Sequence, residues 1–318
     1  MRFMIEIRAR NRPPSLDPIL QENYELIMTH ETSFEIIRHG DKQGKELSEK
    51  GREQARSKAR EIYGEIRLMP PDAVVCLFSS NVGRAQRTEE EIVNALRELC
   101  VGDQDIEILS VQELKKIEEA KEQGQKKIVI VDTAPQMGLG FDEKNDPAEA
   151  AFNKYHARYQ DENAIGKIWI ARAQELPALK AELHAQYPGV DSSDINPADF
   201  IKLPEEFVLN FLRFLRRMVQ ISRKHFPDRP AHIVGVSHNY NADLPTLVLM
   251  GKPLNVASIN ELGGTFRDFM ESSEFIFGED GKTSVTYRRE KTEIHQSIEE
   301  AIKTLKKSLE ERKKEWER

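Results

Sequence analysis

The stretch Phe34-Glu35-Ile36-Ile37-Arg38-His39-Gly40 joins a short apolar run to a cationic tripeptide. The run is too short for a helix, and its isoleucines are typical of a buried strand. Arg38, His39 and Gly40 follow directly, so we expect them at the carboxyl end of that strand. Ligands of open α/β sheets bind in the crevice beyond the carboxyl ends of the strands. The stretch therefore predicts a central strand and one wall of a binding site.

Downstream of this strand, helical and strand patterns alternate. The stretch Leu47-Ser48-Glu49-Lys50-Gly51 leads into a predicted helix, whose apolar residues recur every three or four positions until Pro70-Pro71. A second buried strand is predicted over residues 74–78, and a second helix over 83–99. This order of elements favours a three-layer α/β sandwich with a mostly parallel central sheet.

The third strand has two candidates, residues 106–109 and 127–131, and the pattern is compatible with either or both. A charged helix is predicted between them, over 112–123. The remaining predicted elements are an apolar helix from Pro204, a strand over 233–238, a helix over 244–250, and a hairpin of 275–277 with 283–287.

Three segments are expected outside this core. Residues 1–30 are interpreted as an N-terminal extension with one edge strand, and residues 140–200 as a mostly helical insertion. We expect one domain over residues 1–290 and a charged C-terminal helix over 291–318. That helix has coiled-coil spacing, so it is expected either to pair with a second copy, giving a homo-oligomer, or to pack on its own domain. Its spaced apolar residues are Ile298, Ile302, Leu305, Leu309 and Trp316.

Composition excludes several classes of protein. The chain of 318 residues has 47 Lys and Arg against 54 Asp and Glu, a net charge of −7, which argues against a surface that binds nucleic acid throughout. Cys76 and Cys100 suggest neither a disulfide framework nor a zinc cluster. No apolar stretch approaches the ~20 residues of a membrane span, so we expect a cytoplasmic protein without membrane contact.

Three predicted strands end in cationic or hydrogen-bonding residues. These are Arg38-His39-Gly40, Ser80 to Arg84, and Ser237-His238. Two arginines and two histidines in one crevice would form a compact anion site without a metal ion, because the guanidinium fork matches phosphate oxygens. One neutral imidazole can act as a nucleophile, while a second donates a hydrogen bond to the transferring group.

The same segments resemble the ordered motifs of the histidine phosphatase superfamily, which includes the cofactor-dependent phosphoglycerate mutases. Its Arg-His-Gly motif matches residues 38–40, and its Leu-Thr-x-x-Gly-x-x-Gln-Ala motif matches the stretch from Leu47 to Ala55. Its Ser-x-x-x-Arg-Ala-x-x-Thr motif matches the stretch from Ser80 to Thr88, and its Ser-His strand end matches Ser237-His238. Each motif alone is weak, but four in the correct order are specific.

This resemblance implies a two-step phosphoryl transfer without a cofactor or metal. His39 would attack phosphorus in line and form a phosphohistidine, which water would then hydrolyse. Arg38, Arg84 and His238 would bind the equatorial oxygens of the phosphoryl group.

The sequence departs from the family in two places. A carboxylate usually follows the third strand and protonates the leaving group, but Met137 stands at the aligned position. Glu113, Asp142 and Glu143 are alternatives, and the sequence does not choose among them. The loop after Arg-His-Gly is also shorter than in the mutases, which favours a hydrolase over a mutase.

Three functions follow from these observations. The leading hypothesis is a phosphatase that acts on a phosphorylated small molecule or a phosphoprotein. A phosphoglycerate mutase-like isomerase is the alternative within the enzymes. A degenerate member of the family that binds phosphorylated ligands without turnover is the alternative outside them, because the acid is missing at Met137.

Other polar residues receive structural interpretations. Ser80 is expected to end its strand and cap the next helix, Asp243 to lie at a helix N-terminus, and Arg52 and Arg87 to face solvent. The histidines outside the motifs are interpreted as ordinary surface or core residues: His30, His156, His184, His225, His232 and His295.

Overall fold

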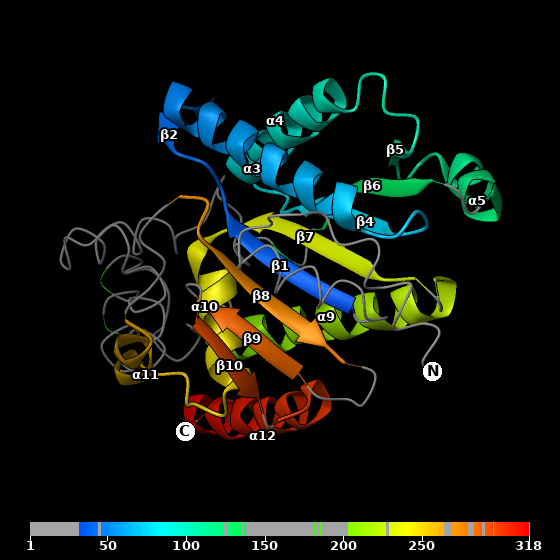
Figure 1. The fold of residues 1–318 in the computed structure, drawn as a ribbon. Coiled ribbons are helices and arrows are strands. Elements are labelled where there is room, and N and C mark those ends of the chain that lie inside the picture. The colour runs from blue at the N-terminus through cyan, green and yellow to red at the C-terminus, as the bar shows by residue number, and fades with distance from the viewer. Residues whose placement is uncertain are drawn as a thin grey trace.

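A computed structural model of the chain gives the fold (Figure 1). It describes residues 32–43, 46–123, 126–134, 137, 203–226, 229–263, 269–278, 283–287, 290–294 and 296–317, together with residues 181 and 185. The expected N-terminal extension (1–30) and, apart from residues 181 and 185, the expected insertion (140–200) lie outside these residues. Within the described part of the chain, no helix has the length and apolar character that crossing a bilayer requires.

One eight-stranded sheet forms the middle layer of the molecule, in the order β10-β9-β8-β1-β7-β4-β6-β5. The five parallel strands are β1 (Thr32–Arg38), β7 (Ala231–Ser237), β4 (Val74–Ser79), β6 (Lys127–Thr133) and β5 (Ile106–Ser110). The antiparallel strands on one side are β8 (Ser272–Phe277), β9 (Thr283–Tyr287) and β10 (Glu290–Ile294). A small hairpin of β2 (Lys42–Gln43) and β3 (Glu46–Leu47) follows β1.

Helices cover both faces of this sheet (Figure 1). On one face lie α3 (Glu49–Leu68) and α4 (Gly83–Leu99). On the other lie α9 (Pro204–His225), α10 (Asn239–Leu249) and α12 (Ile298–Glu317). Two shorter helices are α5 (Leu114–Gln123), which packs against β5 and β6, and α11 (Val256–Glu261), beside α10. The arrangement is the three-layer sandwich with a mostly parallel central sheet that the sequence predicts.

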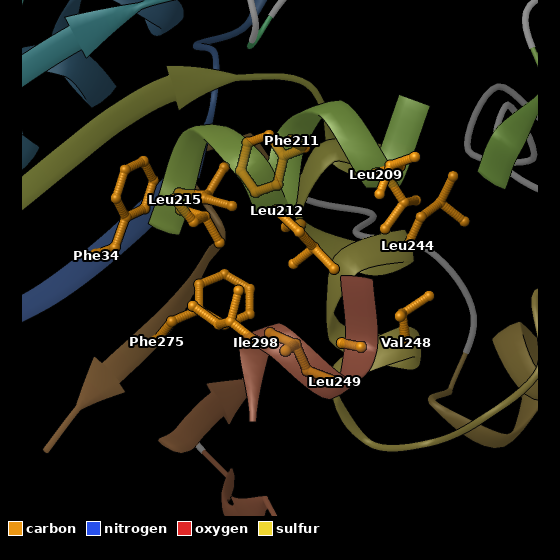
Figure 2. Packing of buried hydrophobic residues seen from close by; sticks show 14 of the residues in the cluster. Phe34, Leu209, Phe211, Leu212, Leu215, Leu244, Val248, Leu249, Phe275 and Ile298 are labelled. Atoms are coloured by element: carbon orange, nitrogen blue, oxygen red, sulfur yellow. The ribbon is translucent and has the colours of Figure 1, made fainter. Parts of the chain in front are cut away.

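The larger hydrophobic core lies between β1 and the helices α9, α10 and α12 (Figure 2). Phe34 of β1 is fully buried there, and its ring meets Phe211 and Phe214 of α9 edge-on at centroid distances of 6.3 and 6.0 Å. Edge-to-face contacts of this kind add to the stabilisation that burial of the rings provides. The first strand is therefore fixed by the core on the face opposite to α3 and α4.

Most predicted elements form close to their expected positions. Both candidates for the third strand are real, since β5 and β6 pair in parallel with α5 between them. Two differences occur near the C-terminal half. Helix α10 begins at Asn239, five residues before the expected start, and the strand β10 was not expected. Neither segment has a strong apolar period, because α10 is buried on nearly all sides and β10 lies at the edge of the sheet.

The apolar residues of α12 pack on the chain's own core. Ile298, Ile302, Leu305 and Leu309 are all buried in the cluster that α9 shares. The guanidinium of Arg312 also donates to the Glu205 carboxylate of α9 at 3.0 Å. Of the two expected arrangements, packing within the chain is the one that the structure contains. The boundary at residue 290 and assembly through this helix stay predictions.

A buried polar cluster lies on the α3 face of the sheet. The Lys58 ammonium of α3 donates to the Glu35 carboxylate of β1 at 2.8 Å. The His232 ring of β7 shares a hydrogen bond of 2.6 Å with the Ser33 hydroxyl. Burial lowers the pKa of His232, while burial raises the pKa of Glu65 to about 7. His232, expected to be an ordinary residue, is thus part of a structural network away from the strand ends.

A second buried carboxyl group lies under the end of β4. The Ser79 hydroxyl donates to Glu89 of α4, and the other carboxylate oxygen of Glu89 has no hydrogen-bond partner among the described residues. Burial raises the pKa of Glu89 to about 7 from its ordinary 4.5. The ionised form is therefore disfavoured in the folded protein, because water no longer solvates it.

Glu89→Gln should stabilise the protein more at pH 8 than at pH 5. The folded-state pKa lies above the unfolded value, so wild-type stability falls as pH rises between about 4.5 and 7. Glutamine keeps an acceptor for Ser79 and does not ionise. We expect the free energy of unfolding of the variant, relative to wild type, to increase by up to about 3 kcal/mol across this interval. Urea denaturation at both pH values measures this difference in the free energy of unfolding.

Glu90→Gln, on the exposed side of the same helix, is the matched control. An equal effect in both variants would contradict the assignment of the buried, protonated carboxyl group to Glu89.

Candidate active site

The predicted site residues meet at the carboxyl ends of β1, β7 and β4, which are neighbours in the sheet. Arg38 ends β1 opposite Ser237, which ends β7. Beyond these ends, the His39 N–H donates to the Ser237 carbonyl at 2.9 Å, and the Ser80 N–H donates to the Val236 carbonyl at 3.0 Å. The three loops therefore leave the sheet at the same level.

The two histidines lie against each other. The rings of His39 and His238 have centroids 5.2 Å apart and cross at 70°. Both residues are buried, with 5% and 3% of their surface exposed. His238 is the residue before α10, and Arg84 lies in the first turn of α4. The structure thus brings together the side chains that the sequence assigns to one crevice.

Cationic groups surround these imidazoles. Burial, followed by the charge of Arg84 and then that of Arg38 and Lys42, lowers the pKa of His39 to about 3 despite a hydrogen bond to Gly40. Burial and Arg84 likewise hold the pKa of His238 well below its ordinary value. The site thus combines two neutral imidazoles with three cationic side chains, a combination that suits a bound anion such as phosphate.

A hydrogen bond selects the tautomer of His39. Its Nδ1 lies 2.8 Å from the Gly40 carbonyl oxygen. A carbonyl oxygen only accepts hydrogen bonds, so Nδ1 must carry the proton of the neutral ring. The lone pair is then on Nε2. His39 accordingly has the protonation state that a nitrogen nucleophile needs, with the reactive atom at the far end of the ring.

Helix α4 holds the Arg-His-Gly loop through Thr88. The Gly40 N–H donates to Thr88 Oγ1 at 3.1 Å, and that hydroxyl donates to the Arg84 carbonyl at 2.8 Å. Thr88 is fully buried. The last residue of the Ser-x-x-x-Arg-Ala-x-x-Thr motif therefore links the loop that carries His39 to the turn that carries Arg84.

Helix α3 holds the same loop from the other side. Ser48 caps the helix by accepting from the Gly51 N–H at 3.0 Å, and its hydroxyl donates to Asp41 at 2.7 Å. Gln54 accepts from the Asp41 N–H at 3.0 Å. These contacts use the Ser, Gly and Gln positions of the second motif, so that motif positions the loop rather than the phosphate.

Gly51 allows the closest approach in this arrangement. A Cβ atom at Gly51 would lie 2.1 Å from the Asp41 carbonyl oxygen, and one at Gly40 would lie 2.9 Å from the Gly51 carbonyl oxygen. Both obstacles are backbone atoms, which cannot rotate away. The loop and the helix can pack at this distance only when both positions lack a side chain.

Two structural interpretations of polar residues were wrong. Val82 precedes α4 without a side-chain cap, while Ser80 accepts from the Val82 N–H at 3.4 Å and lies 3.5 Å from His238 Nε2. Ser80 therefore borders the site.

Because α10 starts at Asn239, Asp243 lies inside the helix, where it is buried and accepts from the Tyr287 hydroxyl at 2.8 Å. Arg52 and Arg87 are half exposed and pair with Glu49 and Glu46, in agreement with a solvated face.

The position aligned with the family's acid faces the core. The Met137 side chain is fully buried against Gly235 and Phe34, and its carbonyl accepts from Ser237 and Asn241. Glu113 lies next to β5, at the far edge of the sheet, where it accepts from the Ser110 N–H and pairs with Lys116. The other two candidates, Asp142 and Glu143, lie outside the described residues.

No group of three or more His, Cys, Asp or Glu side chains suited to a metal ion occurs in the described part of the chain.

Sequence reasoning missed two residues that the fold brings to the site. Lys42 follows the Arg-His-Gly motif and adds its charge to the crevice. Phe269 precedes β8 and touches both Arg38 and His39. The proximity of Lys42 to the motif was a usable signal. Nothing in the sequence around Phe269 marks it, because only the pairing of β8 with β1 brings it near.

We expect opposite effects from two glycine substitutions in α3. Gly51→Ala should lower the free energy of unfolding by about 1–3 kcal/mol, because its Cβ would meet the Asp41 carbonyl. Gly64→Ala, whose Cβ would meet nothing within 4 Å, should raise it by about 0.5–1 kcal/mol through helix propensity. Urea denaturation measures both. Equal stabilisation by the two alanines would show that the loop does not pack on α3 as described.

The imidazole of His39 should not titrate between pH 5 and pH 8, and the pKa of His238 should lie well below its ordinary value. The pKa of His39 is about 3, and that of His238 is also lowered by burial and by Arg84. Carbon-detected NMR of the ring resonances, assigned by His39→Gln and His238→Gln, measures this. In the urea-unfolded chain the same rings should titrate near pH 6.5. A midpoint close to 6.5 in the folded protein would contradict the electropositive, buried site.

Comparison with known proteins found no matching family model and no matching curated protein. Solved structures do match, and they are members of the histidine phosphatase superfamily. Mycobacterial glucosyl-3-phosphoglycerate phosphatase is 16% identical over 76% of this chain and 89% of its own, with a TM-score of 0.39. Bacillus stearothermophilus YhfR is 13% identical over 81% and 97%, with a TM-score of 0.42, and phosphoglycerate mutase from Bacillus anthracis is 12% identical over 87% and 97%, with a TM-score of 0.39.

Proposed function

We propose that this protein is a metal-independent phosphatase of the histidine phosphatase type, which hydrolyses a phosphomonoester through a phosphohistidine on His39. The observation that supports it best is the buried pair of neutral imidazoles beside Arg84 and Arg38. In this pair, the Gly40 carbonyl fixes the Nδ1 proton of His39 and leaves Nε2 as the nucleophile. The substrate class is a phosphorylated small molecule or a phosphoprotein.

In the first step, the Nε2 lone pair of His39 forms a bond to phosphorus while the bond from phosphorus to the ester oxygen breaks. The alcohol leaves with that electron pair and takes up a proton. In the second step, water attacks phosphorus, the bond from nitrogen to phosphorus breaks, and the neutral imidazole is restored. The proton that this water loses replaces the one that the alcohol took up. The products are an alcohol and inorganic phosphate, and no oxidant or metal enters the balance.

Arg38, Arg84 and His238 would bind the phosphoryl oxygens during both steps. A phosphoryl transition state spreads charge over its equatorial oxygens, so catalysis depends on fixed donors that point at them. The two arginines supply permanent positive charge. His238 supplies a neutral N–H donor, since burial keeps it uncharged. Lys42 adds long-range attraction for the dianionic substrate at the mouth of the site.

An ester with a poor leaving group needs an acid that protonates the leaving alcohol. Met137 is buried in the core, and Glu113 lies beside β5 at the far edge of the sheet. Esters with good leaving groups, such as p-nitrophenyl phosphate, need little help from an acid. They are therefore the substrates with which to test His39 separately from the acid.

The test is release of phosphate from p-nitrophenyl phosphate in excess EDTA, with wild type and His39→Ala compared from pH 5 to pH 8. We expect turnover in wild type that EDTA does not change and that falls by at least about 10³-fold in His39→Ala, because the nucleophile is removed. Acid-labile, base-stable ³²P on wild type, but not on the variant, would identify phosphohistidine.

His225→Ala is the matched control, because this histidine lies at the end of α9, away from the strand ends. Turnover that survives in His39→Ala would refute the role of His39. Phosphate that stays on an isomerised phosphoglycerate, with little release to water, would favour the mutase. Binding of phosphorylated compounds without turnover, unchanged in His39→Ala, would favour the degenerate binding protein.

A further inference from the structure

An aromatic ring lies over two residues of the site. The guanidinium carbon of Arg38 is 4.3 Å from the centroid of the Phe269 ring, over its face. The ring of His39 is 5.6 Å from the same centroid. His39 therefore contacts two rings, those of Phe269 and His238, and Arg38 shares the first of them.

The backbone next to Phe269 is held in an uncommon conformation. Met270 has a φ of +67°, in the left-handed region, and it is the only residue other than glycine with positive φ in the described part of the chain. Residues other than glycine, asparagine and aspartate rarely adopt this region, because their Cβ atom crowds the backbone. Such strain persists only where surrounding contacts fix it, and it is enriched at functional sites.

Two contacts of Met270 and one of its neighbour Glu271 hold this turn. Its N–H donates to the Arg38 carbonyl at 3.1 Å, and the Arg38 N–H donates to the Glu271 carbonyl at 2.9 Å. The Met270 side chain packs against the apolar cluster under α3 and α4. The strained turn is therefore tied at both backbone groups of Arg38, the residue whose side chain the preceding phenylalanine contacts.

We propose that Phe269 is a positioning residue, which holds the Arg38 guanidinium in place for the phosphoryl group through its aromatic face. The inference rests on the function proposed above. A cation attracts the negative face of an aromatic ring, and a guanidinium held this way still has its N–H donors for oxygens in its own plane.

The second consequence concerns His39. Apolar contact from Phe269 contributes to the burial that keeps this imidazole neutral. One side chain therefore affects both the orientation of the arginine and the environment of the nucleophile. The neighbouring Met270 cannot take over this role of Phe269, since its side chain packs against the apolar cluster under α3 and α4.

The test compares Phe269→Leu with Phe269→Tyr. Leucine keeps an apolar side chain but lacks the aromatic face, and we expect it to weaken binding of inorganic phosphate and to lower kcat/KM for p-nitrophenyl phosphate by roughly 5- to 30-fold. Tyrosine keeps the ring and should remain within about 2-fold of wild type. Phosphate binding is measured by ³¹P NMR titration, which does not depend on turnover. Phe214→Leu, a comparable change in the core of α9, controls for loss of an aromatic residue and should alter the melting temperature only.

A double-mutant cycle shows whether Phe269 acts through Arg38. In an Arg38→Ala background, Phe269→Leu should weaken phosphate binding by less than about 2-fold, because the partner is gone. An equal loss in both backgrounds, or a Tyr variant as weak as the Leu variant, would overturn the inference. If wild type is active and Phe269→Leu matches it, only this inference fails. If wild type neither binds phosphate nor releases it from the ester, the proposed function fails as well.

Discussion

The parallel pairing of β1 with β7 is the constraint on which the rest of the site depends. Its register sets Arg38 opposite Ser237, and one further hydrogen bond, from the His39 N–H to the Ser237 carbonyl, extends the pairing past both strand ends. The residues that follow the two strands are then His39 and His238. A shift of one residue would turn the side chains of β1 to the opposite face and separate the two rings. Burial of Phe34 on the α9 side makes that shift costly.

A second set of contacts, made by α3 and α4, holds the loop that follows β1. Thr88 of α4 binds Gly40, and Ser48, Gly51 and Gln54 of α3 bind or approach Asp41. These contacts account for the uncharged residues of the motifs, whose side chains or lack of a side chain hold the loop in place. They also make the site rigid before any ligand arrives, so little conformational freedom is lost when a phosphoryl group binds.

The electrostatics of the site result from burial and from the neighbouring cations together. An exposed histidine between two arginines would still be hydrated, and its pKa would move less. Here burial has the largest effect on His39 and His238, and Arg84 adds to it. Neutral imidazoles in a cationic pocket combine two properties that conflict in water: a free lone pair for attack and a strong attraction for a dianion.

The sandwich, its parallel strands and the four arginine and histidine residues that follow the strand ends could all be predicted from local patterns in the sequence. Apolar period and motif spacing are local, and Arg38, His39, Arg84 and His238 each sit at the end or start of an element that such patterns reveal. Features that depend on contacts between distant segments could be seen only once the chain was folded. It placed Met137 in the core, turned Ser80 towards His238, packed α12 on α9, and brought Phe269 over Arg38. Each of these follows from the packing of segments far apart in the chain, and no local pattern in the sequence records such packing.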